Sequence, residues 1–118
     1  MKTPPLPAVL AVLPNAAMLI LFYSLALHMR LRLGSWPQSI GDYGFPASLT
    51  NHGHIAWLYC SAWVCSSVIL VPIGMVACLA ARRLRPSLRY FALYGLGWLL
   101  CVGLMALAPA RFLSWWWD

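Results

Sequence analysis

Hydrophobic residues dominate three stretches of the chain, and polar residues gather between these stretches and at the ends. Residues 6–27, 55–81 and 90–110 contain no charged side chain. At 1.5 Å per residue they form helices of roughly 33, 40 and 32 Å, against a hydrocarbon core of about 30 Å. They lack the strict alternation of strands, and within lipid a helix pairs its own backbone groups. The pattern predicts one all-α domain, residues 1–118: an integral membrane bundle of three transmembrane helices, at about 6–33, 52–81 and 88–112, with a polar loop between helices one and two.

Composition supports a lipid environment. The chain is 63% hydrophobic and 8% charged, against roughly 45–50% and 25% in soluble domains, and its mean hydropathy is +0.78. The net charge of +6 could indicate a nucleic-acid partner. However, the arginines stand at the ends of apolar stretches and form no basic face with aromatic residues between them. The lipid bilayer is therefore the expected partner, and nucleic acid is not.

The distribution of positive charge predicts the orientation. With three crossings, the N-terminus and the second connection share one side, and they carry five of the eight basic residues, whereas the other side carries Arg30, Arg32 and Arg111. Because positive loops stay in the cytoplasm, the N-terminus is expected inside and the C-terminus outside. A cleaved signal peptide ending near Ser24 is the alternative, but the first apolar stretch exceeds the usual 7–15 residues and arginines follow it.

The polar segment between the first two helices has signals for a helix end and a helix start. Gly34 follows Arg30 and Arg32 and is suited to a left-handed residue that ends the first helix. Trp36 is expected at the depth of the lipid headgroups. Thr50 or Asn51 is expected to cap the second helix. Each of these residues has a structural role, so the segment alone does not demand an active site.

The octet "RLRLGSWP", residues 30–37, resembles a stretch found after the first helix of small bacterial multi-pass membrane proteins. The resemblance is limited to these eight positions. It implies an integral membrane fold of three or four helices and a bacterial source. With that source, the expected location is the inner membrane, with the C-terminus in the periplasm. The resemblance implies no activity, cofactor or site residue.

Small residues four positions apart predict close helix packing. Ala62 and Ser66, and Gly74 and Cys78, form such pairs in the second helix, where they would let neighbouring backbones approach. Since the pairs lie on more than one face, we expect the second helix at the centre of the bundle. The short connection "RRLRPS" would make the second and third helices antiparallel neighbours. The four cysteines all lie in apolar stretches, where thiols pack as small hydrophobic groups.

Three histidines carry the clearest candidate chemistry. His28 and His54 lie near the same end of adjacent helices, an arrangement that suits the axial ligands of a b-type haem or a chlorophyll-type pigment. The histidines together with Asp42 could instead bind Zn²⁺ or Cu²⁺. The alternative without chemistry is that the imidazoles simply lie at the membrane surface. Whether any cofactor binds stays open on the sequence alone.

Tryptophans stand at two depths. Trp63 and Trp98 are each about ten residues into their helices, roughly 15 Å deep, where they could fill space between helices two and three or line a quinone or carotenoid groove. The tail "SWWWD" is expected to anchor at the headgroups or to meet a partner protein. The candidate interface residues are Arg30, Arg32, Trp36, Trp115, Trp116 and Trp117.

No catalytic constellation is evident. The apolar stretches contain no Asp, Glu or Lys that could relay protons or bind a transported ion. The serines at membrane depth, including Ser24 and Ser67, have no histidine or acid at an evident matching depth. We therefore predict a non-catalytic protein, an accessory or structural subunit of a larger membrane complex. A haem- or pigment-binding subunit using His28 and His54 is the alternative, and a small pore-forming protein is a third.

Overall fold

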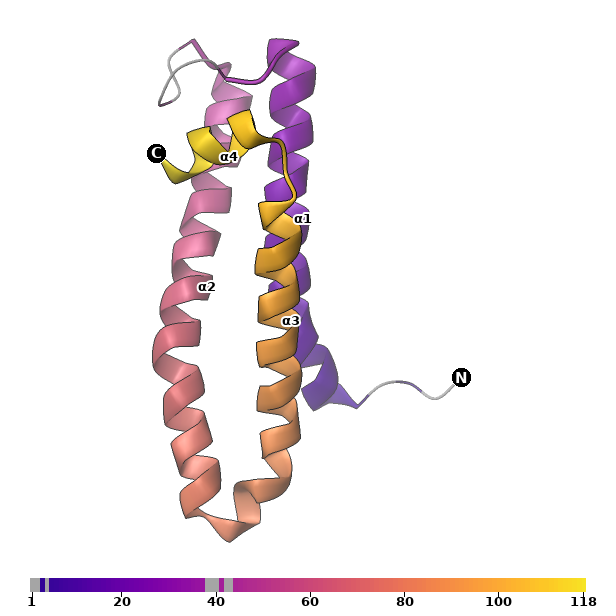
Figure 1. Cartoon of the computed structure of the whole chain (residues 1–118), viewed down its shortest axis with the longest axis vertical. Helices are drawn as coiled ribbons and strands as arrows, with labels where there is room; N and C mark the ends of the chain where they lie inside the picture. Colours follow the sequence, from indigo (N-terminus) through magenta and orange to yellow (C-terminus); the bar gives the residue numbers. More distant parts are fainter. Residues whose placement is uncertain (1–2, 4, 38–40, 42–43) are drawn as a thin grey trace.

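The structure, a computed structural model, describes residues 3, 5–37, 41 and 44–118. In order along the chain these residues form α1 (Leu6–Leu33), α2 (Ala47–Ala80), the 3₁₀ helix η1 (Arg82–Ser87), α3 (Leu88–Ala106) and α4 (Ala110–Trp117). Three helical segments are long and apolar enough to cross a membrane, namely α1, α2 and the segment Arg82–Ala106. The predicted all-α bundle with three membrane-spanning helices is confirmed (Figure 1).

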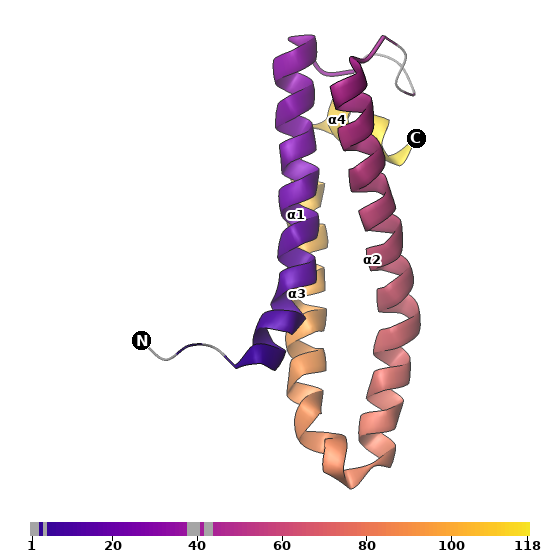
Figure 2. The ribbon, with the colours of Figure 1, turned by 180° about the vertical axis from the view of Figure 1, so that it is seen from behind.

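The first helix, not the second, is the centre of the bundle. α1 packs along both α2 and α3, and Figure 2 looks onto α1 with α3 behind it and α2 beside it. The prediction that the second helix is central is therefore wrong. Apolar residues occupy every side of α1, so apolarity alone does not show which side is buried. In the structure that side carries Ala11, Asn15, Met18, Phe22, Leu25 and Met29.

These buried positions of α1 follow one another at alternating steps of four and three residues. This is the 3.5-residue repeat of helices that pack at a shallow angle, as in coiled coils. Leu13, Ile20 and Leu27 lie between them and are exposed, as expected of side chains that meet lipid. The repeat therefore separates a protein-facing side from a lipid-facing side that is just as apolar.

α2 and α3 form the predicted antiparallel hairpin, joined by η1 (Figure 1). Close to η1 the helices approach tightly, since a Cβ added at Gly74 would lie 2.5 Å from Cζ of Phe91. Further along, α2 and α3 diverge in Figure 1. Trp63 and Trp98 bridge the interval by stacking, with ring centroids 5.2 Å apart, which is the predicted packing of these rings between the two helices.

Helix boundaries differ from the prediction at two places. α2 begins at Ala47, directly after Pro46, so Thr50 and Asn51 lie inside the helix and do not cap it. α3 ends at Ala106 instead of continuing to about residue 112, and the chain restarts as α4 after Pro109. Proline ends one helix and favours the first turn of the next. The expected left-handed residue after the first helix is confirmed at Gly34, with φ 69°.

The C-terminal helix α4 lies across the bundle at the end where α1 finishes and α2 begins (Figure 1). Its inner face buries Phe112 and Trp116, which are 0% and 2% exposed. Both rings meet Phe22 of α1 edge to face, at centroid distances of 5.0 and 5.3 Å. Arg111 and Ser114 are exposed. α4 is thus amphipathic, as expected of a helix that lies flat at a membrane surface.

Candidate functional site

Asn15 joins the three spanning helices at one polar junction. Its side chain is 4% exposed, and it is the buried polar residue of the described core. The amide Nδ2 donates to the backbone oxygen of Tyr94 in α3 at 3.1 Å. The amide oxygen accepts from Nε1 of Trp63 in α2 at 2.9 Å. Within lipid an amide without partners would be strongly destabilising, so these bonds tie the helices together at one register.

A glycine and a cysteine of α3 make room for Asn15. A Cβ added at Gly97 would lie 2.8 Å from Asn15 Nδ2, so the absence of a side chain there lets the amide reach α3. The Cys101 thiol lies 3.4 Å from the backbone oxygen of Asn15 and donates to it. This confirms a packing role for Cys101, which is 3% exposed. Trp98 stacks on Trp63, and its buried indole N–H has no acceptor among the described residues.

Hydroxyl groups extend the junction along α2. The Tyr59 hydroxyl donates to the backbone oxygen of Pro14 at 2.7 Å. The Ser67 hydroxyl donates to the Trp63 carbonyl at 2.6 Å and lies 2.5 Å from the Tyr94 hydroxyl. These hydroxyls therefore have partners within the protein, and they cross from α2 to both neighbouring helices.

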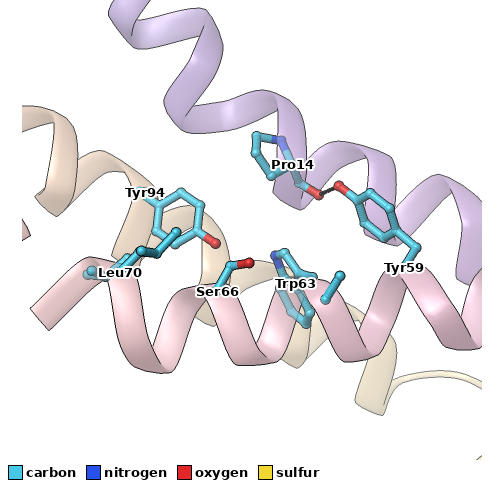
Figure 3. Close-up of a pocket in the computed structure, with 8 residues that line it drawn as sticks. Pro14, Tyr59, Trp63, Ser66, Leu70 and Tyr94 are labelled. Carbon is cyan, nitrogen blue, oxygen red and sulfur yellow. Dashed lines mark hydrogen bonds between the residues drawn. The ribbon is translucent and has the colours of Figure 1, made fainter. Parts of the chain in front are cut away.

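A groove opens beside the junction, at the flank of α2 (Figure 3). Its volume is about 370 Å³, within the range of roughly 300–1,000 Å³ that is usual for ligand sites. Its walls are aromatic and apolar, and the Ser66 and Tyr94 hydroxyls reach into it in Figure 3. The residues that line it are Pro14, Tyr59, Ala62, Trp63, Ser66, Leu70, Val71 and Tyr94.

The four small residues of α2 that were predicted to pack between helices lie in two different settings. Gly74 meets Phe91 of α3, and Cys78 is 4% exposed. Ala62 and Ser66 are exposed, and both line the groove. Gly74 and Cys78 therefore pack inside the bundle, whereas Ala62 and Ser66 lie on its surface.

The histidine that lies beside His28 is His52, not His54. The two Nδ1 atoms are 2.8 Å apart, and the imidazole centroids are 5.1 Å apart. His52 Nε2 is 3.1 Å from the Ser24 hydroxyl, which also donates to the Leu21 carbonyl at 2.9 Å. The expectation that Ser24 has no histidine at its depth is wrong. The α2 helix begins earlier than predicted, which brings His52 into a helix that faces α1.

With both imidazoles neutral, one arrangement of protons satisfies this chain of hydrogen bonds. If the Ser24 hydroxyl donates to Leu21, His52 must donate from Nε2 to the hydroxyl oxygen. His52 Nδ1 is then an acceptor, and His28 Nδ1 is its donor. The 2.8 Å distance leaves room for one proton between the two Nδ1 atoms, because N–H groups on both atoms would face each other.

His54 is exposed and lies in a pocket under α4, away from the His28 and His52 pair. The structure therefore does not bring the two proposed haem ligands together. Among the described residues no three His, Cys, Asp or Glu side chains come together as metal ligands. Asp42 lies outside the described residues.

Some of the residues predicted to contact a partner are engaged within the chain itself, and others are exposed. Arg30 donates to the Gly34 carbonyl at 3.1 Å and stands 5.6 Å from the Trp36 ring, so it closes the end of its own helix. Trp116 is buried on the inner face of α4, and Trp115 donates to the Gly41 carbonyl at 2.8 Å. Arg32 is exposed, and Trp117 is 70% exposed. The aromatic tail therefore packs mainly against its own bundle.

Two features of this region were absent from the sequence-based prediction. Asn15 is the polar residue that marks the protein-facing side of α1, and a polar side chain inside an apolar stretch was a usable signal for it. The pairing of His52 with Ser24 depends on where α2 begins, and nothing local in the sequence indicates that boundary except Pro46. Comparison of the chain with protein-family models, with curated protein sequences and with solved structures finds no match.

Proposed function

We propose that this chain is a non-catalytic accessory subunit of a membrane complex in a bacterial inner membrane, and that a helix of its partner packs into the groove on α2. The observation that carries the proposal is the open pair Ala62 and Ser66. Small residues four positions apart let a second helix approach closely, and close approach drives helix association where no hydrophobic effect operates.

The burial of α2 supports a partner on this side. α2 is 34 residues long, and its buried residues are Leu49, Ala56, Cys60, Trp63 and Cys78. Large side chains such as Leu58, Val68 and Ile69 are 72%, 65% and 57% exposed. Lipid can cover such a surface, but lipid chains fill a groove beside exposed small residues less well than the side chains of a helix do.

The experiment is co-purification from the native membrane in a mild detergent, with substitutions that fill the groove. Ala62→Trp and Ser66→Trp are expected to separate the chain from its partner and to leave the bundle folded, because both side chains are exposed. Val68→Trp is the matched control, since Val68 lies two residues after Ser66, is 65% exposed and does not line the groove. A wild-type chain that migrates alone, or equal effects of all three substitutions, would contradict the proposal.

The proposed orientation places the N-terminus and η1 in the cytoplasm and α4 in the periplasm. Support comes from the exposed arginines of η1, which are Arg82, Arg83 and Arg85, and from the rule that positive connections stay inside. In a chain whose native cysteines are replaced, Ser35→Cys should react with an impermeant maleimide added from the periplasm. Arg83→Cys should react only after the inner membrane is opened. The reverse pattern would invert the topology.

A further inference from the structure

A second pocket lies under α4, at the opposite end of the bundle from η1. Its volume is about 310 Å³. The start of α2 forms one wall, and α4 with Asp118 directly after it forms the other. Trp57 and Trp116 lie 6.0 Å apart between centroids, and Phe45 and Trp115 lie 5.8 Å apart. Four aromatic rings from three segments of the chain therefore surround one space.

This pocket is lined by an acidic residue, although the chain as a whole is basic. The chain has eight basic residues and two acidic ones. Asp118 is one of the residues that line this pocket, and no Lys or Arg is among the described residues that line it. His54 and the Thr50 hydroxyl are its other polar side chains. A carboxylate beside aromatic rings is the combination that attracts an organic cation, through charge and through the negative faces of the rings.

The aromatic walls favour one class of organic cation. A primary ammonium carries three N–H donors that each need an acceptor. The Asp118 carboxylate, the Thr50 hydroxyl and the His54 ring are side-chain acceptors here, and the Gly41 carbonyl already accepts from the Trp115 indole at 2.8 Å. A quaternary ammonium has no N–H group, so it can lie against aromatic carbon with one carboxylate for its charge. Because four aromatic rings surround the space, we expect a choline-type group to fit it better than an ethanolamine-type group.

We propose that the pocket under α4 binds a quaternary ammonium group, with Asp118 as the counter-ion and Trp57 as an aromatic wall. The group can be a free ligand or the headgroup of a phosphatidylcholine, because α4 lies where a spanning bundle meets water. This inference does not depend on the accessory-subunit proposal, since it concerns α4 and not the groove on α2.

The test uses the full chain in nanodiscs of phosphatidylglycerol alone, with radiolabelled choline as the probe in equilibrium dialysis at constant ionic strength. Saturable binding of choline is expected, with weaker competition by ethanolamine than by tetramethylammonium. Asp118→Asn and Trp57→Ala should each weaken binding on the order of tenfold. Trp117→Ala is the matched control and should leave binding unchanged, because Trp117 is 70% exposed and does not line the pocket.

A second arm identifies the source of the group. The chain is extracted from mixed phosphatidylcholine and phosphatidylglycerol membranes, and the lipid that stays bound is weighed by native mass spectrometry. Retention of phosphatidylcholine that Asp118→Asn abolishes supports a headgroup, and choline binding without lipid retention supports a free ligand. Absence of both, or equal losses in Trp117→Ala, would overturn the proposal. Circular dichroism of each variant verifies that the helices are intact.

Discussion

α1 and α2 are similarly apolar helices, yet they have opposite places in the molecule. α1 buries a continuous side and contacts both other spanning helices, whereas α2 is longer and leaves most of its length exposed. Apolarity therefore identifies which residues enter lipid, but it does not identify which helix is central. What distinguishes α1 is one amide side chain, Asn15, which has hydrogen-bonding partners on both neighbouring helices.

The largest expected difference between the two helices comes from truncating an apolar side chain on each. Met18→Ala should lower the free energy of unfolding by about 2–4 kcal/mol, because Met18 is 0% exposed and its loss leaves a cavity. Leu58→Ala should stay within about 0.5 kcal/mol, since Leu58 is 72% exposed. Unfolding in mixed micelles measures both. Equal losses would mean that the buried side of α1 is not the core.

Replacing a polar residue on each helix sharpens the comparison. Asn15→Leu should destabilise the bundle by about 2 kcal/mol, because it removes two side-chain bonds and leaves the Trp63 N–H buried without an acceptor. Ser61→Leu on α2 should have almost no effect, since Ser61 is exposed. The same unfolding assay reports both values. A neutral Asn15→Leu would show that the junction adds nothing to stability.

A smaller effect on stability is expected from substituting two glycines of α3, one that faces α1 and one that does not. Gly97→Ala should cost about 1 kcal/mol, because the added methyl group would overlap Asn15 Nδ2 at 2.8 Å. Gly95→Ala should be neutral or slightly stabilising, since nothing lies within 4 Å of a Cβ at that position. If Asn15 is already leucine, the cost of Gly97→Ala should change, and a double-mutant cycle measures that coupling.

The smallest expected effect lies at the histidine pair that joins α1 and α2. His28→Ala and His52→Ala should show a coupling energy of about 0.5–1 kcal/mol in a double-mutant cycle, as is usual for one hydrogen bond between membrane helices. His54→Ala is the matched control and should couple to neither, because His54 lies in the pocket under α4. Coupling of His28 with His54 instead would favour the arrangement predicted from the sequence.

The three spans and the left-handed Gly34 could be predicted because they depend on local properties, namely apolar length and backbone freedom. The buried side of α1 could not be predicted in the same way, since leucines face lipid and protein alike. α4 was missed because "APARFLSWWW" continues the apolar character of α3. Pro109 was the available signal for a break in that helix.

The same distinction decides which contacts of the candidate sites could be predicted from the sequence. Stacking of Trp63 with Trp98 followed from their equal depth in neighbouring helices. The pairing of His28 with His52 in place of His54 depended on a five-residue difference in where α2 starts and on the turn of the helix that faces α1. A residue two positions further along a helix points about 200° away, so a small error in register exchanges one histidine for another.

The reach of Asn15 along the chain has a consequence for biosynthesis. Its partners Trp63 and Tyr94 come 48 and 79 residues later. At roughly 5–20 residues per second, the ribosome needs about 4–16 s to add the second of them. Until then, the Asn15 side-chain amide of the nascent first helix lacks at least one of its hydrogen-bonding partners. We therefore expect this helix to linger beside the translocon or an insertase and to enter lipid fully only once α3 has emerged.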